Sequence, residues 1–243
     1  MEADQRQNIR QRFQRVQERM ADAARLVNRQ PEEVRLVVVT KTHPLEIVKA
    51  AVEAGAKFLG ENYADEAVTK IQEIKPQNHI QWHMIGHIQS RKASLVSEFF
   101  DYVHSLDRLK IALHLDQYAG KFHKILPVLL ECNTSGEKTK SGWPIWDEAQ
   151  WEQLLPELNQ VAALTHLKVQ GLMTMPPFFD QAEFARPYFQ KLRRFQTFLS
   201  RHIPHVDWHE LSMGMSADFE VAIQEGATWV RIGQEILGPR QAK

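Results

Sequence analysis

Apolar positions near the start of the chain recur every three or four residues. Between residues 4 and 28, positions such as Ile9 and Phe13 follow this spacing, which is the period of an amphipathic helix with one face turned to a core. Pro31 comes soon after, and a proline cannot continue a helix. The pattern predicts a long helix within residues 1–30 that packs on the rest of the fold.

Eight short runs rich in apolar and β-branched residues follow this helix. The first, residues 34–40, is apolar on both faces, which is typical of a strand buried in a parallel sheet. The predicted strands are residues 34–40, 57–61, 80–85, 102–106, 125–132, 168–173, 206–211 and 228–232. Helical patterns lie between them, at residues 45–54, 63–74, 91–99, 108–119, 146–164, 181–202 and 216–225, and a short helical turn at 234–237 ends the series.

Strands that alternate with helices predict a parallel sheet, because each parallel strand needs a crossover back to the same edge. Eight such units favour a single (β/α)8 TIM barrel, a fold of about 250 residues, and the chain has 243. A doubly wound open sheet is the alternative, but it usually has fewer strands and would need a glycine-rich first turn. No linker rich in proline, glycine or serine divides the chain, so we expect residues 1–243 to form one domain.

Charge and composition exclude several classes of partner. The 30 basic residues balance 30 acidic ones, so the chain offers no basic field for a nucleic acid. Its apolar runs are far shorter than the ~20 residues of a membrane helix, and residues 1–20 lack the apolar core of a secretory signal. The single Cys132 agrees with a reducing compartment. We expect a soluble, cytoplasmic protein that binds neither nucleic acid nor membrane.

A lysine stands at the end of the first predicted strand, where a barrel presents its catalytic groups. Lys41 follows the apolar run in the segment VVVTKTHP. A lysine in such a place is most often simply solvated. If it points into the barrel mouth, desolvation favours the neutral amine, which can form a Schiff base with a carbonyl compound.

Two turns rich in glycine and serine follow the seventh and eighth predicted strands, where barrels often bind phosphate with loop amides. Ser212 and Gly214 lie in the first turn, and Gly233 and Gln234 lie in the second. These residue types are also common in ordinary turns and helix caps, so either turn alone is weak evidence. Together they favour a phosphate site, and we expect Met213 in the first turn to pack on a flat ring.

Arg231 lies in the last predicted strand, two residues before Gly233, and therefore faces the same way. An arginine that points into a barrel needs an acceptor, because a buried unpaired guanidinium is very costly. One interpretation is a salt bridge with Glu61 or Glu210, which both lie near strand ends. The other is a contact with a ring nitrogen or an anionic group of a ligand.

Three histidines, His79, His83 and His87, recur every four residues. On a helix this spacing would stack them as metal ligands. The residues around them are typical of a strand, so we expect structural or pocket-lining histidines and no metal site. The chain also lacks the HExxH, Walker, GxGxxG and GxSxG motifs.

Seven motifs occur in a fixed order between residues 34 and 240. They are VVVTKTHP, FLGENYADEAVTKI, QWHMIGHIQSRK, KSG, GLMTMPP, LSMGMSADFEVAI and VRIGQEILGPR. In combination they resemble the pyridoxal phosphate homeostasis protein family. The resemblance implies a single barrel, similar to the N-terminal domain of alanine racemases, that binds pyridoxal 5'-phosphate (PLP).

The resemblance also implies a role for each candidate residue on the ring side of the cofactor. Lys41 matches the lysine that forms the Schiff base with PLP, and Asn62, in the motif GENY, lies beside the cofactor. Arg231 matches the arginine that meets the pyridine nitrogen. A guanidinium there keeps this nitrogen unprotonated, so the ring is a weaker electron sink than it would be beside an acidic group.

On the phosphate side, the resemblance assigns the cradle to Ser212 with the turn after it, and to Gly233 with Gln234. Gln234 departs from the family pattern, which commonly has a small hydroxylic residue at this position. The backbone amide of Gln234 would still serve the phosphate, but a side-chain hydroxyl contact is lost.

Three functions remain open. The first is a protein of PLP homeostasis that holds PLP without turnover, with PLP-requiring apo-enzymes as its partners. The second is a PLP-dependent racemase or related enzyme of low activity, although a racemase usually takes one acid–base tyrosine from a second domain, and the barrel with its helix consumes all 243 residues. The third is an aldolase that uses Lys41 without a cofactor. We expect the first and, since no long apolar seam requires a partner subunit, a monomer.

Overall fold

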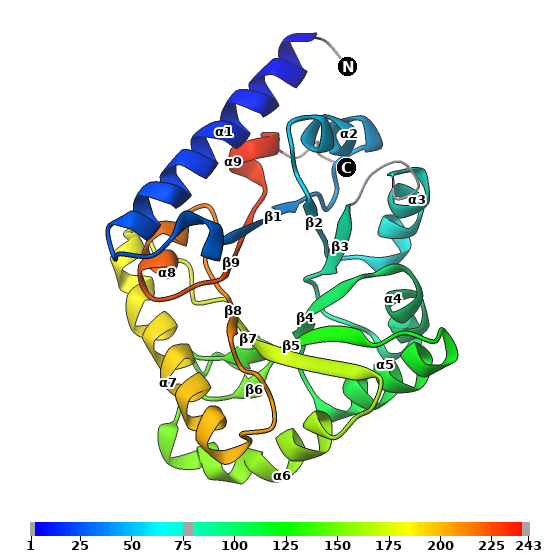
Figure 1. The fold of residues 1–243 in the computed structure, drawn as a ribbon, viewed down its shortest axis with the longest axis vertical. Helices are drawn as coiled ribbons and strands as arrows, with labels where there is room; N and C mark the ends of the chain where they lie inside the picture. Colours follow the sequence, from blue (N-terminus) through cyan, green and yellow to red (C-terminus); the bar gives the residue numbers. More distant parts are fainter. Residues whose placement is uncertain (1–2, 75–79, 240–243) are drawn as a thin grey trace.

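Parallel strands close into a barrel in the computed structural model, which describes residues 3–74 and 80–239 (Figure 1). The strands are β1 (Arg35–Val39), β2 (Phe58–Glu61), β3 (Gln81–Met84), β4 (Tyr102–Leu106), β5 (Leu126–Asn133), β6 (Trp143–Pro144), β7 (Leu167–Thr174), β8 (Glu210–Ser212) and β9 (Trp229–Ile232). Eight of them form a ring in the order β1-β2-β3-β4-β5-β7-β8-β9, which the β9–β1 pairing closes, while the short β6 adds to the end of β5. The (β/α)8 barrel is confirmed, and the open sheet is excluded.

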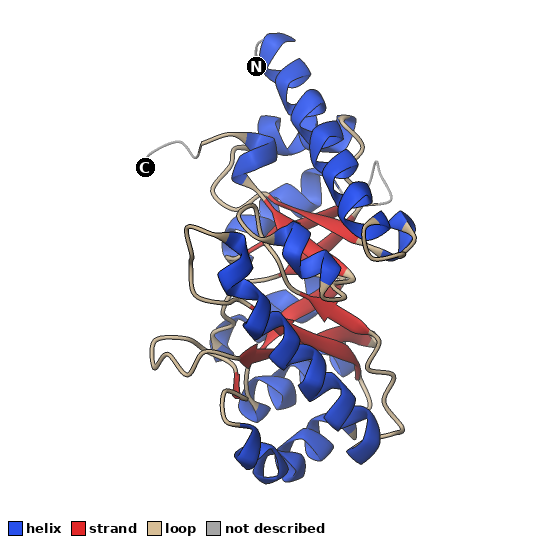
Figure 2. Ribbon diagram, turned by 90° about the vertical axis from the view of Figure 1, so that its left-hand side faces the viewer, coloured by secondary structure: helices blue, strands red, loops and turns tan. Residues whose placement is uncertain are grey.

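Helices surround this ring of strands (Figure 2). They are α1 (Ala3–Arg25), α2 (Leu45–Glu53), α3 (Ala64–Ile74), α4 (Ala93–Phe99), α5 (Leu109–Lys121), α6 (Trp151–Ala162), α7 (Arg186–His202), α8 (Phe219–Gln224) and α9 (Gln234–Leu237). Short 3₁₀ helices occur at Pro31–Glu33, Ser90–Lys92, Glu148–Gln150 and Ala182–Ala185. Within the described ranges, no helix combines the length and the apolar character that crossing a membrane requires.

The long α1 lies outside the ring, beside α8, α9 and α2 (Figure 1). Ile9, Phe13 and Val16 on one face of the helix are buried, as the spacing predicts. At the polar margin of this face, Arg19 binds Glu220 of α8 at 2.8 Å and also Glu235 of α9. The helix is therefore held by an apolar stripe and by ion pairs to two elements near the end of the chain.

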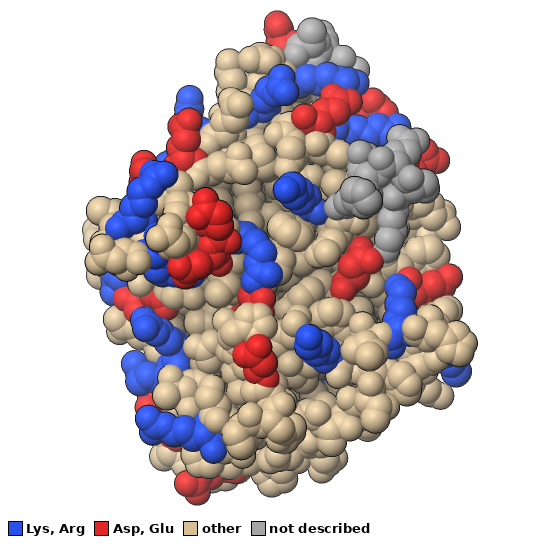
Figure 3. Space-filling view, viewed as in Figure 1, with Lys and Arg blue, Asp and Glu red and all other residues tan. Residues whose placement is uncertain are grey.

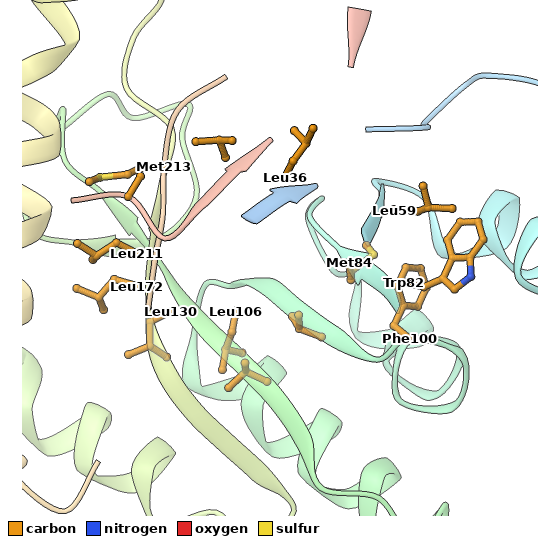
Figure 4. Close-up of a cluster of buried hydrophobic side chains, with 14 of the residues drawn as sticks. Leu36, Leu59, Trp82, Met84, Phe100, Leu106, Leu130, Leu172, Leu211 and Met213 are labelled. Carbon is orange, nitrogen blue, oxygen red and sulfur yellow. The ribbon is translucent and has the colours of Figure 1, made fainter. Parts of the chain in front are cut away.

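Alternate residues of each strand supply two separate hydrophobic layers. Leu36, Leu59 and Trp82 belong to the outer layer between strands and helices (Figure 4). The inner layer fills the barrel and includes Val37 and Leu129. This division follows from the period of two along a strand, which turns successive side chains to opposite faces.

The bounds of several predicted elements differ from those in the structure. The helix expected at 146–164 begins only at Trp151, because a 3₁₀ turn at Glu148–Gln150, capped by the Asp147 side chain, comes before it. The helix expected at 181–202 begins with a 3₁₀ turn, and its α-helical part starts just before Pro187, which suits a first helical turn. The strand expected at 206–211 is shortened to β8, since Trp208 is buried from a loop and donates to Ile203 O at 3.0 Å.

Charged side chains of both signs are interspersed over the face of the molecule that Figure 3 displays. No continuous basic area covers that face. This arrangement agrees with the balanced charge of the sequence.

The packing of α1 gives a first testable prediction. We expect Phe13→Ala to lower the free energy of unfolding by about 3 kcal/mol or more, because it removes a large buried side chain and leaves a cavity. Leu26→Ala, just beyond the end of the same helix, removes a side chain that is 75% exposed and should change stability by less than about 0.5 kcal/mol. Urea titrations of both variants measure this difference, and equal values would contradict the packing of α1 described above.

Candidate functional site

The residues of the expected cofactor site come from four neighbouring strands. The strands β2, β1, β9 and β8 lie side by side in this order. Asn62, Lys41, Gly233, Gln234, Met213 and Gly214 follow these strands, and Arg231 and Ser212 lie within them. Because the carboxyl ends of parallel strands meet at one end of a barrel, one sector of the mouth gathers residues that are far apart in the sequence.

Lys41 is half-buried in a strained turn directly after β1. The next residue, Thr42, has φ 64, a left-handed conformation that is a genuine outlier for a β-branched side chain. The backbone N–H of Thr42 donates to Glu66 Oε1 at 2.7 Å. Strain of this kind persists only where the surroundings hold it, so α3 sets the direction in which the Lys41 turn leaves the strand.

A buried ion cluster supports this turn. Lys70 of α3 donates to Thr40 O at 3.0 Å, to Glu61 Oε1 at 2.9 Å and to Glu66 Oε1 at 2.7 Å. The Thr40 hydroxyl donates to the same Glu61 oxygen at 2.7 Å. Burial raises the pKa of Glu61, although Lys70 acts against this rise. Glu61 is thus engaged beside α3, and the interpretation that it pairs with Arg231 is wrong.

Asn62 follows β2, on the strand next to Lys41. Its Oδ1 is buried and has no hydrogen-bond partner among the described residues. Gly86 lies against its backbone, and a Cβ at Gly86 would come within 2.6 Å of Asn62 Cα. Only glycine therefore allows this close approach. A buried unpaired acceptor is unfavourable, which makes Asn62 a candidate contact for a donor group of a ligand.

Arg231 is buried inside the barrel, and two other strands hold its guanidinium. Nη1 donates to Ser212 Oγ of β8 at 2.6 Å, and Nη2 donates to Thr174 O at the end of β7 at 2.9 Å. Burial lowers the pKa of Arg231 to about 10, although Asp218 and Glu131 act to raise it. The group remains charged at neutral pH and can only donate hydrogen bonds.

Glu210, the other expected partner of Arg231, lies at the start of β8 and binds different groups. It pairs with Arg35 and accepts from the Thr228 hydroxyl at 2.5 Å. The Arg35 guanidinium stands 3.9 Å from the centre of the Trp229 ring. The Arg231–Glu210 pairing is therefore wrong, because Glu210 begins its strand and so lies at the opposite end of the barrel from the mouth.

The first glycine turn divides its side chains between the two faces of β8. Ser212 faces the barrel interior, where its hydroxyl meets Arg231, so only its backbone remains for a phosphate. Met213 is fully buried in the outer layer (Figure 4). The structure therefore does not bring the Met213 side chain to the other candidates. Gly214 has φ +93, and a Cβ there would lie 2.6 Å from Ala222 Cβ, so this turn requires glycine.

The second glycine turn lies against the strand that precedes Lys41. A Cβ added at Gly233 would stand 3.0 Å from Val39 O, which places the turn beside the end of β1. Gln234 is exposed and begins α9. The structure thus brings this turn beside the strand end that precedes Lys41, and the role of Gly233 and Gln234 toward a phosphate stays a prediction.

The structure describes two of the three regularly spaced histidines, His83 and His87. His83 lies inside the barrel, whereas His87 is half exposed and stands 3.1 Å from Asp107. His79 lies outside the described residues. Among the residues that the structure does describe, no group of histidine, cysteine and acidic side chains is arranged to hold a metal ion.

Two polar residues inside the barrel were missed by the sequence analysis. His104 of β4 is fully buried, and Glu131 of β5 is 5% exposed. Burial, with Asp107 as a second cause, raises the pKa of Glu131 to about 7, although Arg231 opposes the shift. The sequence does carry a signal for the position of both residues, the alternation of side chains along each strand. It turns His104 to the same face as Tyr102, and Glu131 to the same face as Leu129.

The raised pKa of Glu131 predicts a dependence of stability on pH. The native carboxyl binds its proton more tightly than the unfolded chain does, so the free energy of unfolding falls as pH rises from about 4.5 to about 7. We expect Glu131→Gln to remove roughly 2 to 3 kcal/mol of this fall. Urea titrations at both ends of the range test it, with the exposed Glu152 of α6 as the matched control site for a Glu→Gln change. A wild type and Glu131→Gln variant with parallel pH profiles would refute the assignment.

Comparison with known proteins identifies the family. The model of the alanine racemase N-terminal domain matches residues 6–241. The pyridoxal phosphate homeostasis protein of Vibrio alginolyticus is 41% identical over 236 residues, which cover 96% of this chain and 98% of that protein. The solved structure of PipY from Synechococcus elongatus PCC7942 with PLP bound has a TM-score of 0.78 and 33% identity, and it covers 90% of this chain and 100% of that one.

The same protein solved without PLP has a TM-score of 0.80 and 34% identity over 91% of this chain and 99% of that one. Relatives and structures thus match over nearly the whole length on both sides. The chain belongs to the pyridoxal phosphate homeostasis protein family, which is built on the alanine racemase N-terminal domain.

Proposed function

We propose that this chain binds PLP at the mouth of its barrel and serves PLP homeostasis, with Lys41 as the residue that holds the cofactor. The single observation that carries the proposal is the sector of neighbouring strands that presents Lys41, Asn62 and Arg231 together with two glycine turns. The PLP bound to PipY supports the proposal from a relative of known structure.

The residues of this sector fit the chemical groups of PLP. When bound, PLP supplies an aldehyde that condenses with a primary amine to form a Schiff base, and Lys41 is the amine at this place. The unpaired Asn62 Oδ1 is an acceptor for the phenolic hydroxyl beside the aldehyde. Gly214 and Gly233 allow the backbone to approach a phosphate closely. The Arg231 guanidinium is the donor for the ring nitrogen.

Arg231 also supports the interpretation as a holder of PLP rather than an enzyme. Much of the chemistry of PLP uses the ring as an electron sink, and a proton on the ring nitrogen strengthens this sink. A guanidinium that remains charged and already donates to Ser212 and Thr174 offers this nitrogen a hydrogen bond but no proton. The bound ring is then a poor electron sink, which suits storage and transfer of the cofactor.

The wider organisation belongs to the same proposal. Residues 1–243 act as one PLP-binding domain, with α1 as part of it, and the chain works as a monomer in the cytoplasm. Its partners are PLP-requiring apo-enzymes, which take up the cofactor that Lys41 releases. Exchange of one amine for another at the PLP aldehyde allows such a release without any oxidant or metal.

The role of Lys41 can be tested by absorption spectroscopy. We expect wild-type protein mixed with PLP to develop a visible band, Lys41→Ala to lack it, and Lys57→Ala, at a cavity near α1 on the other end of β2, to keep it. Borohydride reduction followed by peptide mapping should place the PLP on Lys41. A wild type that stays colourless would reject the proposal and favour the cofactor-free aldolase, and a band in Lys41→Ala would assign the cofactor to another amine.

A second measurement separates the holder from the racemase. We expect the PLP-loaded protein to show no sustained turnover in assays for racemase, decarboxylase and transaminase activity, because Arg231 disfavours carbanion stabilisation. Apo-forms of PLP enzymes added to the loaded protein should regain activity. Turnover in wild type that Lys41→Ala abolishes would instead establish an enzyme.

A further inference from the structure

A chain of four polar side chains runs from Arg231 into the closed interior of the barrel. Arg231 Nη1 lies 2.6 Å from Ser212 Oγ, and Ser212 Oγ lies 2.7 Å from His104 Nδ1. His104 Nε2 lies 2.8 Å from His83 Nδ1. All four side chains are buried, and they come from β9, β8, β4 and β3, so the chain crosses from one wall of the barrel to another.

Two directions of hydrogen bonding are open to these side chains when both histidines are neutral, and one of them leaves fewer polar groups unpaired. A guanidinium only donates, so Ser212 Oγ accepts from Arg231. The Ser212 hydroxyl proton is used when it goes to His104 Nδ1, whereas the reverse direction leaves both this proton and His83 Nε2 without a partner among the four side chains. A neutral His104 with an unprotonated Nδ1 carries its proton on Nε2 and donates it to His83 Nδ1. His83 then carries its own proton on Nε2.

The surroundings keep both histidines neutral. Burial lowers the pKa of His83 to about 3, and Arg35 of β1 adds to this effect. Burial lowers the pKa of His104 well below its usual range, and His83, Arg231 and Arg35 act in the same direction. The other titratable group against the pair is Tyr102, whose ring stacks on His83 at 5.1 Å, and burial raises its pKa.

The four linked polar side chains are unusual for the interior of a barrel. The interior of such barrels is mostly filled by branched apolar side chains, and His83 Nε2 is buried with no hydrogen-bond partner in the described part of the chain. Neutral imidazoles with an unsatisfied donor stabilise a barrel less well than leucine or valine would. The arrangement therefore calls for a role other than packing.

We propose that His104, supported by His83, is a positioning residue for the PLP ring. By taking the proton of Ser212, His104 fixes the rotation of that hydroxyl, so that a lone pair of Oγ faces Arg231 Nη1, while Thr174 O holds Nη2. The guanidinium is thus fixed in one orientation, and its remaining N–H groups serve the ring nitrogen. The sequence motifs assign no role to His104 and leave His83 as a structural or pocket-lining histidine, and the inference rests on the proposed PLP function only in its last step.

The first experiment examines the hydrogen bonds that link Ser212, His104 and His83 in protein without PLP. In ¹⁵N spectra of the histidine side chains, we expect His83 and His104 to be neutral Nε2–H tautomers from about pH 5 to about pH 8. In Ser212→Ala, His104 loses its Nδ1 donor, and its tautomer signal should shift, while that of the outer His166 stays in place. A charged His104, or an Nδ1–H tautomer in wild type, would overturn the proposal whether or not PLP binds.

The second experiment examines the effect on the ligand, using PLP labelled with ¹⁵N at the ring nitrogen. His104→Leu removes the acceptor for Ser212, and we expect a changed ring-nitrogen shift and about tenfold weaker PLP binding, the effect of one lost hydrogen bond. His104→Asn keeps an acceptor near the place of Nδ1 and should restore both values toward wild type. His166→Leu, outside the barrel, is the matched control.

The outcomes separate the two proposals. If wild type binds no PLP, the proposed function fails, while the histidine tautomers of the PLP-free protein still test the hydrogen bonds that link the four polar side chains. If His104→Leu binds PLP with an unchanged ring-nitrogen shift, or if His104→Asn fails to restore it, the histidines serve only the structure and the inference is wrong. Should His104→Leu not fold, Ser212→Ala with the same labelled PLP replaces it.

Discussion

The burial of one guanidinium organises this barrel. A charged group inside a protein is tolerated only when hydrogen-bond partners hold it, and two N–H groups of Arg231 of β9 bond to acceptors from β7 and β8 rather than to a carboxylate. Neutral acceptors leave the positive charge uncompensated by a direct ion pair, so it stays available to an anionic or electron-rich ligand. The barrel interior is thus arranged for a partner that enters from the mouth.

The second constraint is the backbone of the Lys41 turn. Thr42 has a left-handed conformation that costs free energy in a β-branched residue. Lys70, with Glu61 and Glu66, ties this turn to α3 through short buried contacts. Removal of one member of such a cluster leaves an unpaired buried charge, so the direction of Lys41 and the docking of α3 on β1 and β2 depend on each other.

The sequence predicts the strand order and the sector of the mouth well, because both follow from local patterns. Apolar runs mark each strand, and the residues just after a strand must lie at the mouth once the barrel closes. The direction of a side chain is harder to predict at the end of a strand. Ser212 and Met213 are adjacent, yet Ser212 turns into the barrel and Met213 into the outer layer. The partner of Arg231 could not be predicted, because it depends on which strands close the ring.

The surroundings of His104 and Glu131 also could not be predicted from the sequence. Each lies in a run of apolar residues that is read correctly as a strand, but a single polar residue in such a run gives no sign of what stands across the barrel. Only closure of the ring places His104 against Ser212 and Glu131 within the field of Arg231. The helix predicted at 146–164 is wrong at its start, where Asp147 caps a 3₁₀ turn at Glu148–Gln150 and the α-helix follows from Trp151.

These groups together determine how the charge near Arg231 depends on pH. Arg231, with a pKa of about 10, stays protonated, and the lowered pKa values of His83 and His104 keep both rings neutral. Among these interior groups, Glu131 is the one with a pKa of about 7. Its ionisation would place a negative charge near the guanidinium and so weaken the attraction of Arg231 for an anionic ligand. The hold on a phosphorylated cofactor should therefore loosen as Glu131 ionises, while the hydrogen bonds that orient Arg231 stay unchanged.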